Sequence, residues 1–381
     1  MTTIAFCLLT YRPDHPSGIE RAIAALAEGL RRAGHDVFIV AGGPPADGED
    51  RDVVRLSSVT LPRPAVNADV LAALADPGPV VTEVRRVLAE RGAGIVCWGA
   101  PVWGLGHLHP APPGTVTALM AHNTIRPGSA GTWAAAIDAA DVVLPASSYL
   151  VEAARDSGWD TGKWTVLPNA LLTAVTPPSR AQRERLRLHG PLRLVSRASP
   201  GKGQAAFLAA MPDWWQRPVE VVLAEADFEF TRGETARAIA DCRLQQERRP
   251  DMISILPALP WHQVPAFLAG AALAPMTSVE PETFSLVAAE SLSAGTPVTA
   301  FDLGYVPSLV GPAGTVIPVD AGMEGMWEAI TDLLNDRDAY HAASRAAPAR
   351  LGAHTPEHAA AVFLAATTGA PVPPVPGPAA G

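Results

Sequence analysis

Two glutamates, Glu282 and Glu290, flank a segment that has the chemistry to hold a phosphorylated, polyhydroxylated ligand. Residues 286–294 are small or apolar apart from Glu290, which predicts a buried helix. Leu286 and Glu290 are four residues apart and share a helix face, so this carboxylate must find hydrogen-bond donors or shift its pKa. Glu282 precedes the helix start, where backbone N–H groups favour negative charge. The alternative interpretation is a helix-capping Glu282 and a Glu290 in a core salt bridge.

A basic turn carries the complementary charge. Arg197 ends an apolar run of strand length, and Lys202 follows between two glycines. The chain has one other lysine, Lys163, and its remaining basic residues apart from histidine are arginines. A lysine between two glycines is therefore a stronger functional candidate here than an average lysine. A guanidinium and an ammonium at a strand-to-helix turn suit a diphosphate, although a solvated basic turn is the alternative. This turn lacks the Walker P-loop pattern. The loop after the first strand lacks Gly-x-Gly-x-x-Gly, and this absence disfavours a nicotinamide enzyme.

The first strand leads into another candidate ligand loop. Residues 4–10 form an apolar run, and a turn-rich segment containing Gly18 separates it from a helical pattern. Ser17 and Glu20 have the spacing of a capping box at the start of that helix. A strand, a glycine and a helix N-terminus together predict an anion or hydroxyl site, with an ordinary strand-to-helix connection as the alternative.

Two further strand ends carry polar or aromatic candidates. His122 and Asn123 directly follow the predicted strand 116–121, and Trp98 ends the predicted strand 94–98. In open parallel sheets, ligands bind at the carboxyl ends of the strands, and a histidine there can donate or accept a hydrogen bond. A structural histidine is the alternative. The segment 98–113, rich in Gly, Pro, Trp and His, is predicted to be a loop near a surface or cleft.

Length, charge and cysteine content narrow the class of protein. The length of 381 residues suggests two domains. The net charge of −9 disfavours a surface that binds nucleic acid or an anionic membrane. No apolar run is long enough for a membrane span, and the N-terminal run has no basic flank, so neither an integral membrane contact nor a signal peptide is expected. Three widely spaced cysteines fit a reducing cytoplasm, without a disulfide framework or a zinc site.

Alternating strand and helix patterns predict an α/β protein made of two doubly wound, Rossmann-like domains that face each other across a cleft. The expected first domain is 1–175 and the second is 190–354, and a Pro-containing, charged junction lies between them. Residues 355–370 are expected to form a closing helix that packs back on the first domain. Residues 371–381 form a Pro-rich tail.

These motifs resemble those of the retaining, GT-B-fold glycosyltransferases of group 1, glycosyltransferase family 4. Arg197 and Lys202 match the family's Arg-x4-Lys spacing, and the two glutamates match its Glu-x7-Glu spacing within a Phe-x-Leu-Val and Gly-x-Pro-Val frame. Pro168-Asn169 matches a segment before the interdomain linker. His122 falls where the family places a histidine at a strand end.

The resemblance implies roles for the candidate residues. Arg197 and Lys202 would hold the diphosphate of a nucleotide-sugar and stabilise the leaving group, Glu282 would contact the sugar, and Glu290 would bind the ribose hydroxyls. The resemblance places catalysis at His122, Arg197, Lys202 and Glu282. Further donor contacts would come from Gly18 and from the backbone of Phe284, Ser285, Leu286 and Val287. The acceptor side would include Trp98, His122 and Asn123.

The implied activity is transfer of a sugar from a nucleotide-diphosphate-sugar to a small-molecule acceptor with retention of configuration, by front-face attack. No metal and no cofactor are implied, and a homodimer remains open. Natural-product biosynthesis, such as that of an antibiotic, is one role suggested by the composition. The alternatives are a catalytically silent nucleotide-sugar-binding protein and another GT-B enzyme such as a nucleotide-sugar epimerase.

Some positions depart from the family pattern and leave the donor's base and sugar undetermined. The first loop has Ser17-Gly18 where the family usually has two glycines, and Ala170 follows Asn169 where a glycine is usual. The segment 304–308 also differs from the family's Gly-Gly-x-x-Glu. Glu280 lies two residues before Glu282, so either glutamate could contact the sugar.

Overall fold

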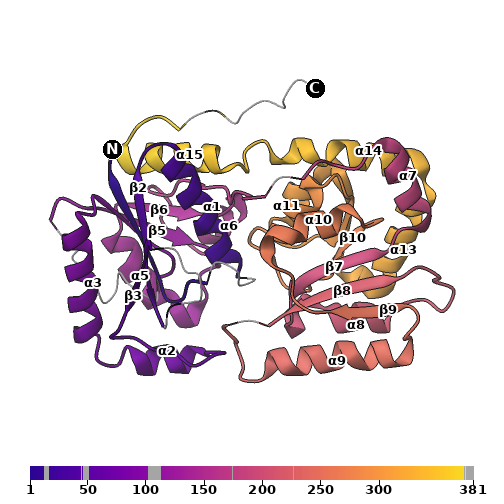
Figure 1. The fold of residues 1–381 in the computed structure, drawn as a ribbon, viewed down its shortest axis with the longest axis horizontal. Helices are drawn as coiled ribbons and strands as arrows, with labels where there is room; N and C mark the ends of the chain where they lie inside the picture. The colour runs from indigo at the N-terminus through magenta and orange to yellow at the C-terminus, as the bar shows by residue number, and fades with distance from the viewer. Residues whose placement is uncertain are drawn as a thin grey trace. The chain divides into compact units, whose positions relative to one another are not determined.

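The computed structural model describes residues 1–12, 17–43, 45, 51–101, 113–173, 175–225, 227–372 and 374. Contacts within the described chain divide it into two compact units (Figure 1). The first unit contains residues up to 172 together with a C-terminal segment that begins at 353, and the second contains residues 173–352.

The first unit is built on a six-stranded parallel sheet with the order β3-β2-β1-β4-β5-β6. This is the Rossmann order, in which the chain reverses its direction of winding between β1 and β4. The strands are β1 (Thr3–Leu8), β2 (Asp36–Gly42), β3 (Val53–Leu56), β4 (Ile95–Trp98), β5 (Val116–Ala121) and β6 (Val142–Pro145). The helices include α1 (Gly18–Arg32), α2 (Asn67–Ala73), α3 (Gly78–Arg91), α5 (Ala130–Ala139) and α6 (Ser148–Asp156).

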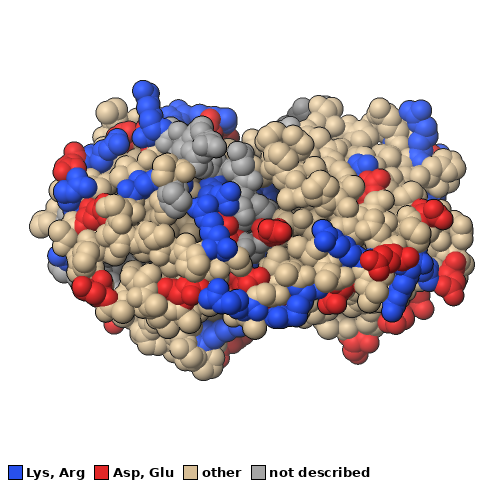
Figure 2. All heavy atoms as spheres, turned by 60° about the horizontal axis from the view of Figure 1, so that its bottom comes forward, with Lys and Arg blue, Asp and Glu red and all other residues tan. Residues whose placement is uncertain are grey.

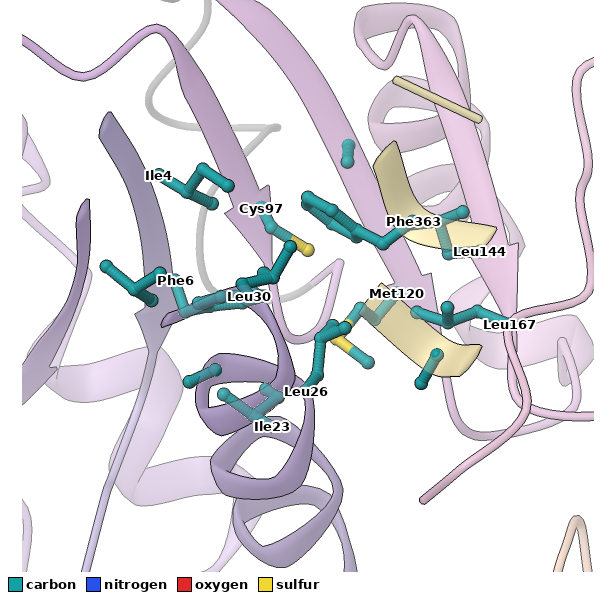
Figure 3. Packing of buried hydrophobic residues seen from close by; sticks show 14 of the residues in the cluster. Ile4, Phe6, Ile23, Leu26, Leu30, Cys97, Met120, Leu144, Leu167 and Phe363 are labelled. Carbon is teal, nitrogen blue, oxygen red and sulfur yellow. The ribbon is translucent and has the colours of Figure 1, made fainter. Parts of the chain in front are cut away.

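The C-terminal helix α15 (Pro356–Thr368) completes the core of the first unit. It packs against α1, where a Cβ added at Gly29 would lie 2.0 Å from the Pro356 carbonyl oxygen. Its fully buried Phe363 lies among side chains of the sheet, including Cys97, Met120 and Leu144 (Figure 3). Burying these apolar side chains is the main force that holds a C-terminal helix on an N-terminal sheet.

The second unit repeats the same winding. Its two parallel three-stranded ladders, β9-β8-β7 and β10-β11-β12, are joined by a parallel bridge between Leu192 and Leu273. The strands are β7 (Leu192–Arg197), β8 (Val219–Ala224), β9 (Ile253–Leu256), β10 (Ala274–Met276), β11 (Val298–Phe301) and β12 (Gly314–Ile317). The helices include α7 (Arg180–His189), α8 (Gln204–Ala209), α9 (Glu234–Arg248), α10 (Val264–Ala269), α11 (Leu286–Ser293), α12 (Val306–Val310), α13 (Gly322–Asn335) and α14 (Arg337–Ala346).

The junction before the second unit is shorter than the expected segment 176–189. Residues 180–189 form α7, which begins with a Ser179–Gln182 capping box and belongs to the second unit. The charged residues of this segment are the reason for assigning it to the junction. In the structure, Arg183 and Arg187 are buried, and their guanidinium groups bind backbone carbonyls.

The capping-box prediction at α1 is also wrong. Ser17 is the N-cap residue, but its side chain makes no capping hydrogen bond. The buried Glu20 carboxylate instead accepts from Thr10 Oγ1 at 2.8 Å and from the Arg12 backbone N–H at 2.7 Å. Glu20 therefore fixes the loop that follows β1 rather than the helix entrance.

Basic and acidic residues are interspersed on the face drawn in Figure 2. Within the described residues, no helix combines the length and the apolar character needed to cross a membrane. The three cysteines are free and buried, and burial raises the pKa of each thiol.

Candidate active site

The candidate ligand residues of the second unit come together at its topological switch point. In the joined sheet, β7 and β10 are neighbours from which the chain winds in opposite directions. Arg197 is the last residue of β7, and the segment after β10 leads to Glu282. Crevices at such points, beyond the carboxyl ends of the strands, are where doubly wound sheets bind ligands.

The turn that carries Lys202 is locked against the segment after β10. Gly203 has φ +67°, and a Cβ there would lie 2.2 Å from the Thr277 carbonyl oxygen, so a side chain is excluded by both strain and space. Thr277 Oγ1 donates to the Lys202 carbonyl at 2.6 Å, and the Val279 N–H donates to the Gly201 carbonyl at 3.0 Å. The glycines therefore allow two strand-end segments to touch and hold Lys202 in place.

Lys202 and Glu282 form a half-buried ion pair through Nζ and Oε1. The backbone of Glu282 is held by the segment after β11. Gly304 bridges it in parallel, and the Tyr305 N–H donates to the Glu282 carbonyl at 2.8 Å. Gly304 has φ +66°, and a Cβ there would lie 2.2 Å from the Glu282 carbonyl oxygen. Lys202 and Glu282, 80 residues apart in the chain, thus belong to one preorganised cluster.

The two neighbouring glutamates occupy different environments. Glu280 is exposed, and its carboxylate packs over Gly201, where an added Cβ would lie 2.6 Å from the carboxyl carbon. Glu282 is largely shielded and paired with Lys202. This difference favours Glu282 as the ligand-contacting residue of the two.

Strained backbone marks the entrance to α11. Ser285 has φ +76°, the one non-glycine residue with positive φ among those described. It is the N-cap residue of α11, and its hydroxyl accepts from the Ala288 N–H at 3.4 Å. Phe284 is buried and stacks on Tyr305 with ring centroids 5.9 Å apart. Such strain persists where surrounding packing enforces it, and it concentrates at functional sites.

The remaining donor-side predictions in the second unit lie on the same elements. Leu286 and Glu290 are both buried on α11, with Glu290 3% exposed. Val287 is half-buried in the first turn of the helix. Arg197 is half-buried, and its guanidinium has no hydrogen bond or ion pair with any residue in the described part of the chain. The site therefore offers two cations, a helix N-terminus and two carboxylates.

Four predicted residues belong to the first unit. Gly18 is the exposed first residue of α1, Trp98 is the buried last residue of β4, and His122 and Asn123 follow β5. Burial lowers the pKa of His122 to about 4, so this imidazole is neutral at pH 7. Asn123 is exposed. Most of the predicted loop 98–113 lies outside the described residues.

Several supporting residues have no clear signal in the sequence. Arg55 on β3 donates to the Gly42 and Tyr11 carbonyls, at 2.8 and 2.5 Å, and braces the loop after β1. Thr277 and Gly304 fix the backbones of Lys202 and Glu282 through contacts distant in sequence. No local sequence pattern identifies the distant partners of Thr277 and Gly304.

Two family models match the chain over most of its length. The model "Glycosyl transferases group 1" matches residues 192–350. The model "Glycosyltransferase Family 4" matches residues 16–175. Each model falls on one unit: the first covers Arg197, Lys202 and both glutamates, and the second covers Gly18 and His122. No curated protein matches the sequence.

Solved structures of similar fold cover more than nine tenths of the chain. Sucrose-phosphate synthase (tll1590) from Thermosynechococcus elongatus is 18% identical, with a TM-score of 0.75 over 93% of this chain and 95% of its own. Anabaena Alr3699/HepE, solved in complex with UDP and glucose, is also 18% identical with a TM-score of 0.75, over 97% of this chain and 100% of its own. AviGT4, a glycosyltransferase involved in avilamycin A biosynthesis, is 17% identical with a TM-score of 0.61 over 97% of both chains.

The fold evidence and the family models agree. Both units are parallel α/β sheets in Rossmann order, as in the GT-B structures to which the chain is similar. The group 1 model falls on the unit that holds the Lys202–Glu282 pair and α11. The chain belongs to the group 1 glycosyltransferases of the GT-B fold.

Proposed function

We propose that this enzyme transfers a sugar from a nucleotide-diphosphate-sugar to a small-molecule acceptor with retention of anomeric configuration. The observation that carries the proposal is the Lys202–Glu282 pair, placed beside the N-terminus of α11 at the switch point of the second sheet. A cation and a helix N-terminus suit a diphosphate, and a carboxylate suits sugar hydroxyls. The turn before α8 and the segment after β10 thus bring both kinds of recognition within hydrogen-bonding reach of each other.

Each side chain has a distinct part in this proposal. Lys202 and Arg197 neutralise the charge that develops on the departing diphosphate, and N–H groups at the start of α11 add to this stabilisation. Glu282 accepts hydrogen bonds from the sugar and keeps Lys202 in place. The buried Glu290 accepts from ribose hydroxyls, which offsets the cost of burying its charge.

The neighbours suggest which donor to try first. Alr3699/HepE was solved in complexes with UDP and UDP-glucose, so we propose a UDP-sugar donor for this chain. The involvement of AviGT4 in avilamycin A biosynthesis supports a natural-product acceptor. We further propose that transfer takes place in the cytoplasm without a metal ion, with Arg197 and Lys202 supplying the positive charge.

A thermal-shift screen with UDP, GDP, ADP and TDP and their common sugars tests the donor assignment. A ligand that binds only the native state raises the melting temperature, by an amount that follows its concentration relative to Kd. We expect the largest shift with UDP or a UDP-sugar, unchanged by EDTA. A shift abolished by EDTA would refute metal independence, and no shift with any nucleotide would refute the donor site.

Product analysis separates transfer from silent binding and from epimerisation. An active transferase hydrolyses its donor slowly in the absence of acceptor, so we expect free sugar from UDP-glucose. NMR of the first-released anomer reports retention or inversion. Binding without release would favour a silent protein, and conversion into another UDP-sugar without an acceptor would favour an epimerase.

A further inference from the structure

Arg183, a buried residue on α7, makes contacts directed at the helix that carries Glu290. Its side chain is 2% exposed. Nη1 donates to the Ala271 carbonyl at 2.7 Å, and Nη2 lies 2.8 Å from both the Ala294 carbonyl and Thr296 Oγ1. Nη2 also contacts the Ala269 carbonyl at 3.1 Å. One guanidinium therefore ties the end of α10 to the end of α11.

The contact with Ala294 is close to the candidate site along the helix. Ala294 is the C-cap residue of α11, and its N–H donates to the Glu290 carbonyl at 3.2 Å. Glu290 is thus one hydrogen-bonded turn from the carbonyl that Arg183 holds. The whole helix has eight residues, or about 12 Å at 1.5 Å per residue, so a displacement at one end reaches the other.

The charge of Arg183 also suits this position. A cation is favourable at a helix C-terminus, where backbone carbonyls lack intrahelical partners. The segment entering α7 touches the same end, because a Cβ added at Gly295 would lie 3.1 Å from Pro177 Cβ. Ser344 Oγ donates to the Gly295 carbonyl at 2.7 Å. The C-terminal end of α11 is consequently buried and held by side chains from other elements.

We propose that Arg183 is a positioning residue: by anchoring the C-terminal end of α11 it holds Glu290 and the helix N-terminus in register for the nucleotide-sugar. This inference depends on the proposed function only where its test measures nucleotide binding. Arg183 touches no ligand-contacting side chain in these contacts, so it acts through α11.

Arg187 offers a matched control on the same helix. It is one turn further along α7 and is also buried, at 8% exposed. Its guanidinium binds the Glu184 carboxylate at 2.9 and 3.0 Å and donates to the Leu334 carbonyl of α13 at 2.5 Å. Arg187 therefore ties α7 to α13, and none of its hydrogen bonds reaches α11.

The experiment compares Arg183→Met with Arg187→Met in the full chain. Losing a buried guanidinium leaves backbone carbonyls without donors, so both variants should melt at lower temperature. We expect only Arg183→Met to weaken UDP binding, by about tenfold in calorimetric Kd, and to raise the donor KM more than it lowers kcat. Equal losses of affinity in the two folded variants, or an unchanged Kd in Arg183→Met, would overturn the proposal.

A second variant, and a measurement that needs no ligand, test the positioning role of Arg183 independently of UDP binding. Arg183→Lys retains the charge, but its single nitrogen cannot span α10 and α11, so we expect partial recovery of affinity. Hydrogen exchange of the α11 amides should speed up in the Arg183 variants and not in Arg187→Met. Unchanged exchange would reject the positioning role. If the wild-type chain bound no nucleotide, the proposed function would fail, while exchange would still decide whether Arg183 anchors α11.

Discussion

Lys202 and Lys163 allow a direct test of the phosphate site at the scale of single residues. Lys202 pairs with Glu282 at the switch point, whereas Lys163 donates to the Ala140 carbonyl in the first unit. Lys202→Ala removes a cation from the site where, in the proposed function, charge develops on the leaving group. We expect its kcat to fall by about a hundredfold or more.

The matched control is Lys163→Ala, which removes the only other lysine of the chain. Steady-state kinetics of both variants with the same donor and acceptor provide the comparison, and circular dichroism checks that both are folded. We expect Lys163→Ala to stay close to wild type. Near-wild-type turnover of folded Lys202→Ala would remove Lys202 from the phosphate site.

His122 gives the stability a defined pH dependence. Burial lowers its pKa from 6.5 to about 4, so between these values the unfolded chain binds more protons than the native chain. The stability contributed by the neutral imidazole is therefore present above pH 6.5 and is lost as pH falls toward 4. The loss attributable to this group is at most about 3 kcal/mol.

Urea unfolding of the wild type and of His122→Asn between pH 7 and pH 5 measures this dependence. We expect the free energy of unfolding to fall more steeply with decreasing pH in the wild type. This range avoids Glu184, because the hydrogen bond from Arg187 lowers the Glu184 pKa to about 2, and the stability it contributes is lost only at lower pH. Identical slopes would mean that His122 takes up its proton in the native state.

At the scale of elements, the turn before α8 depends on a glycine that no side chain can replace. Gly203 combines φ +67° with backbone 2.2 Å from the position of a Cβ, whereas Gly34 has φ +85° with open space around it. We expect Gly34→Ala to lower the free energy of unfolding by about 1 kcal/mol through backbone strain alone. Gly203→Ala should cost about 3 kcal/mol, because a steric clash adds to the strain.

Chemical denaturation of both glycine variants measures this difference, and UDP titration shows whether the turn also shapes the site. Only Gly203→Ala should weaken UDP binding, since its turn carries Lys202. Equal destabilisation of the two variants would show that the segment after β10 can move away from the turn without lowering the free energy of unfolding.

The sequence predicts the regular elements well where local pattern decides them. The sequence predicts strands at 142–145, 192–197, 219–224 and 253–256 and helices at 234–248 and 264–269, and these ranges are the bounds of β6, β7, β8, β9, α9 and α10. Their strands are short apolar runs between turn residues, and burial on both faces leaves little freedom in register. Local composition and tertiary structure agree in these segments.

The errors arise where a distant partner changes the meaning of a residue. The charged stretch around Arg183 is predicted to be part of the domain junction, yet the carbonyls of residues 269, 271 and 294 give its guanidinium a buried binding site. Glu20 has capping-box spacing, but the loop after β1 takes its carboxylate. Predicting the pairing of Lys202 with Glu282 likewise requires knowledge of the order of strands in the sheet, and no local sequence pattern gives that order.

At the scale of the whole molecule, the two units differ in how the chain completes them. Residues 173–352 form the second unit without a break, and the first requires the segment from 353 onward. Every residue proposed to bind the donor, except Gly18, lies in the continuous unit. We expect a fragment of residues 173–352 to fold and bind UDP with measurable affinity, as a melting-temperature shift would report.

A fragment of residues 1–172 should behave differently because it lacks α15. Without Phe363 and its neighbours, part of the apolar core next to β1, β4 and β5 would face water. We expect this fragment to aggregate, and co-expression with residues 353–376 to restore a monomer with native circular dichroism. A stable 1–172 fragment would show that α15 is dispensable for the core.

The position of α15 also bears on how the protein is made. Domains usually fold in the order in which they leave the ribosome. Here the N-terminal unit must wait for α15, which is synthesised after the second unit, while the second unit has all of its residues before α15 is made. Folding order is then the reverse of synthesis order, so a prematurely terminated chain presents an unfinished N-terminal core to chaperones and proteases. Only chains that extend through α15 would escape this quality control.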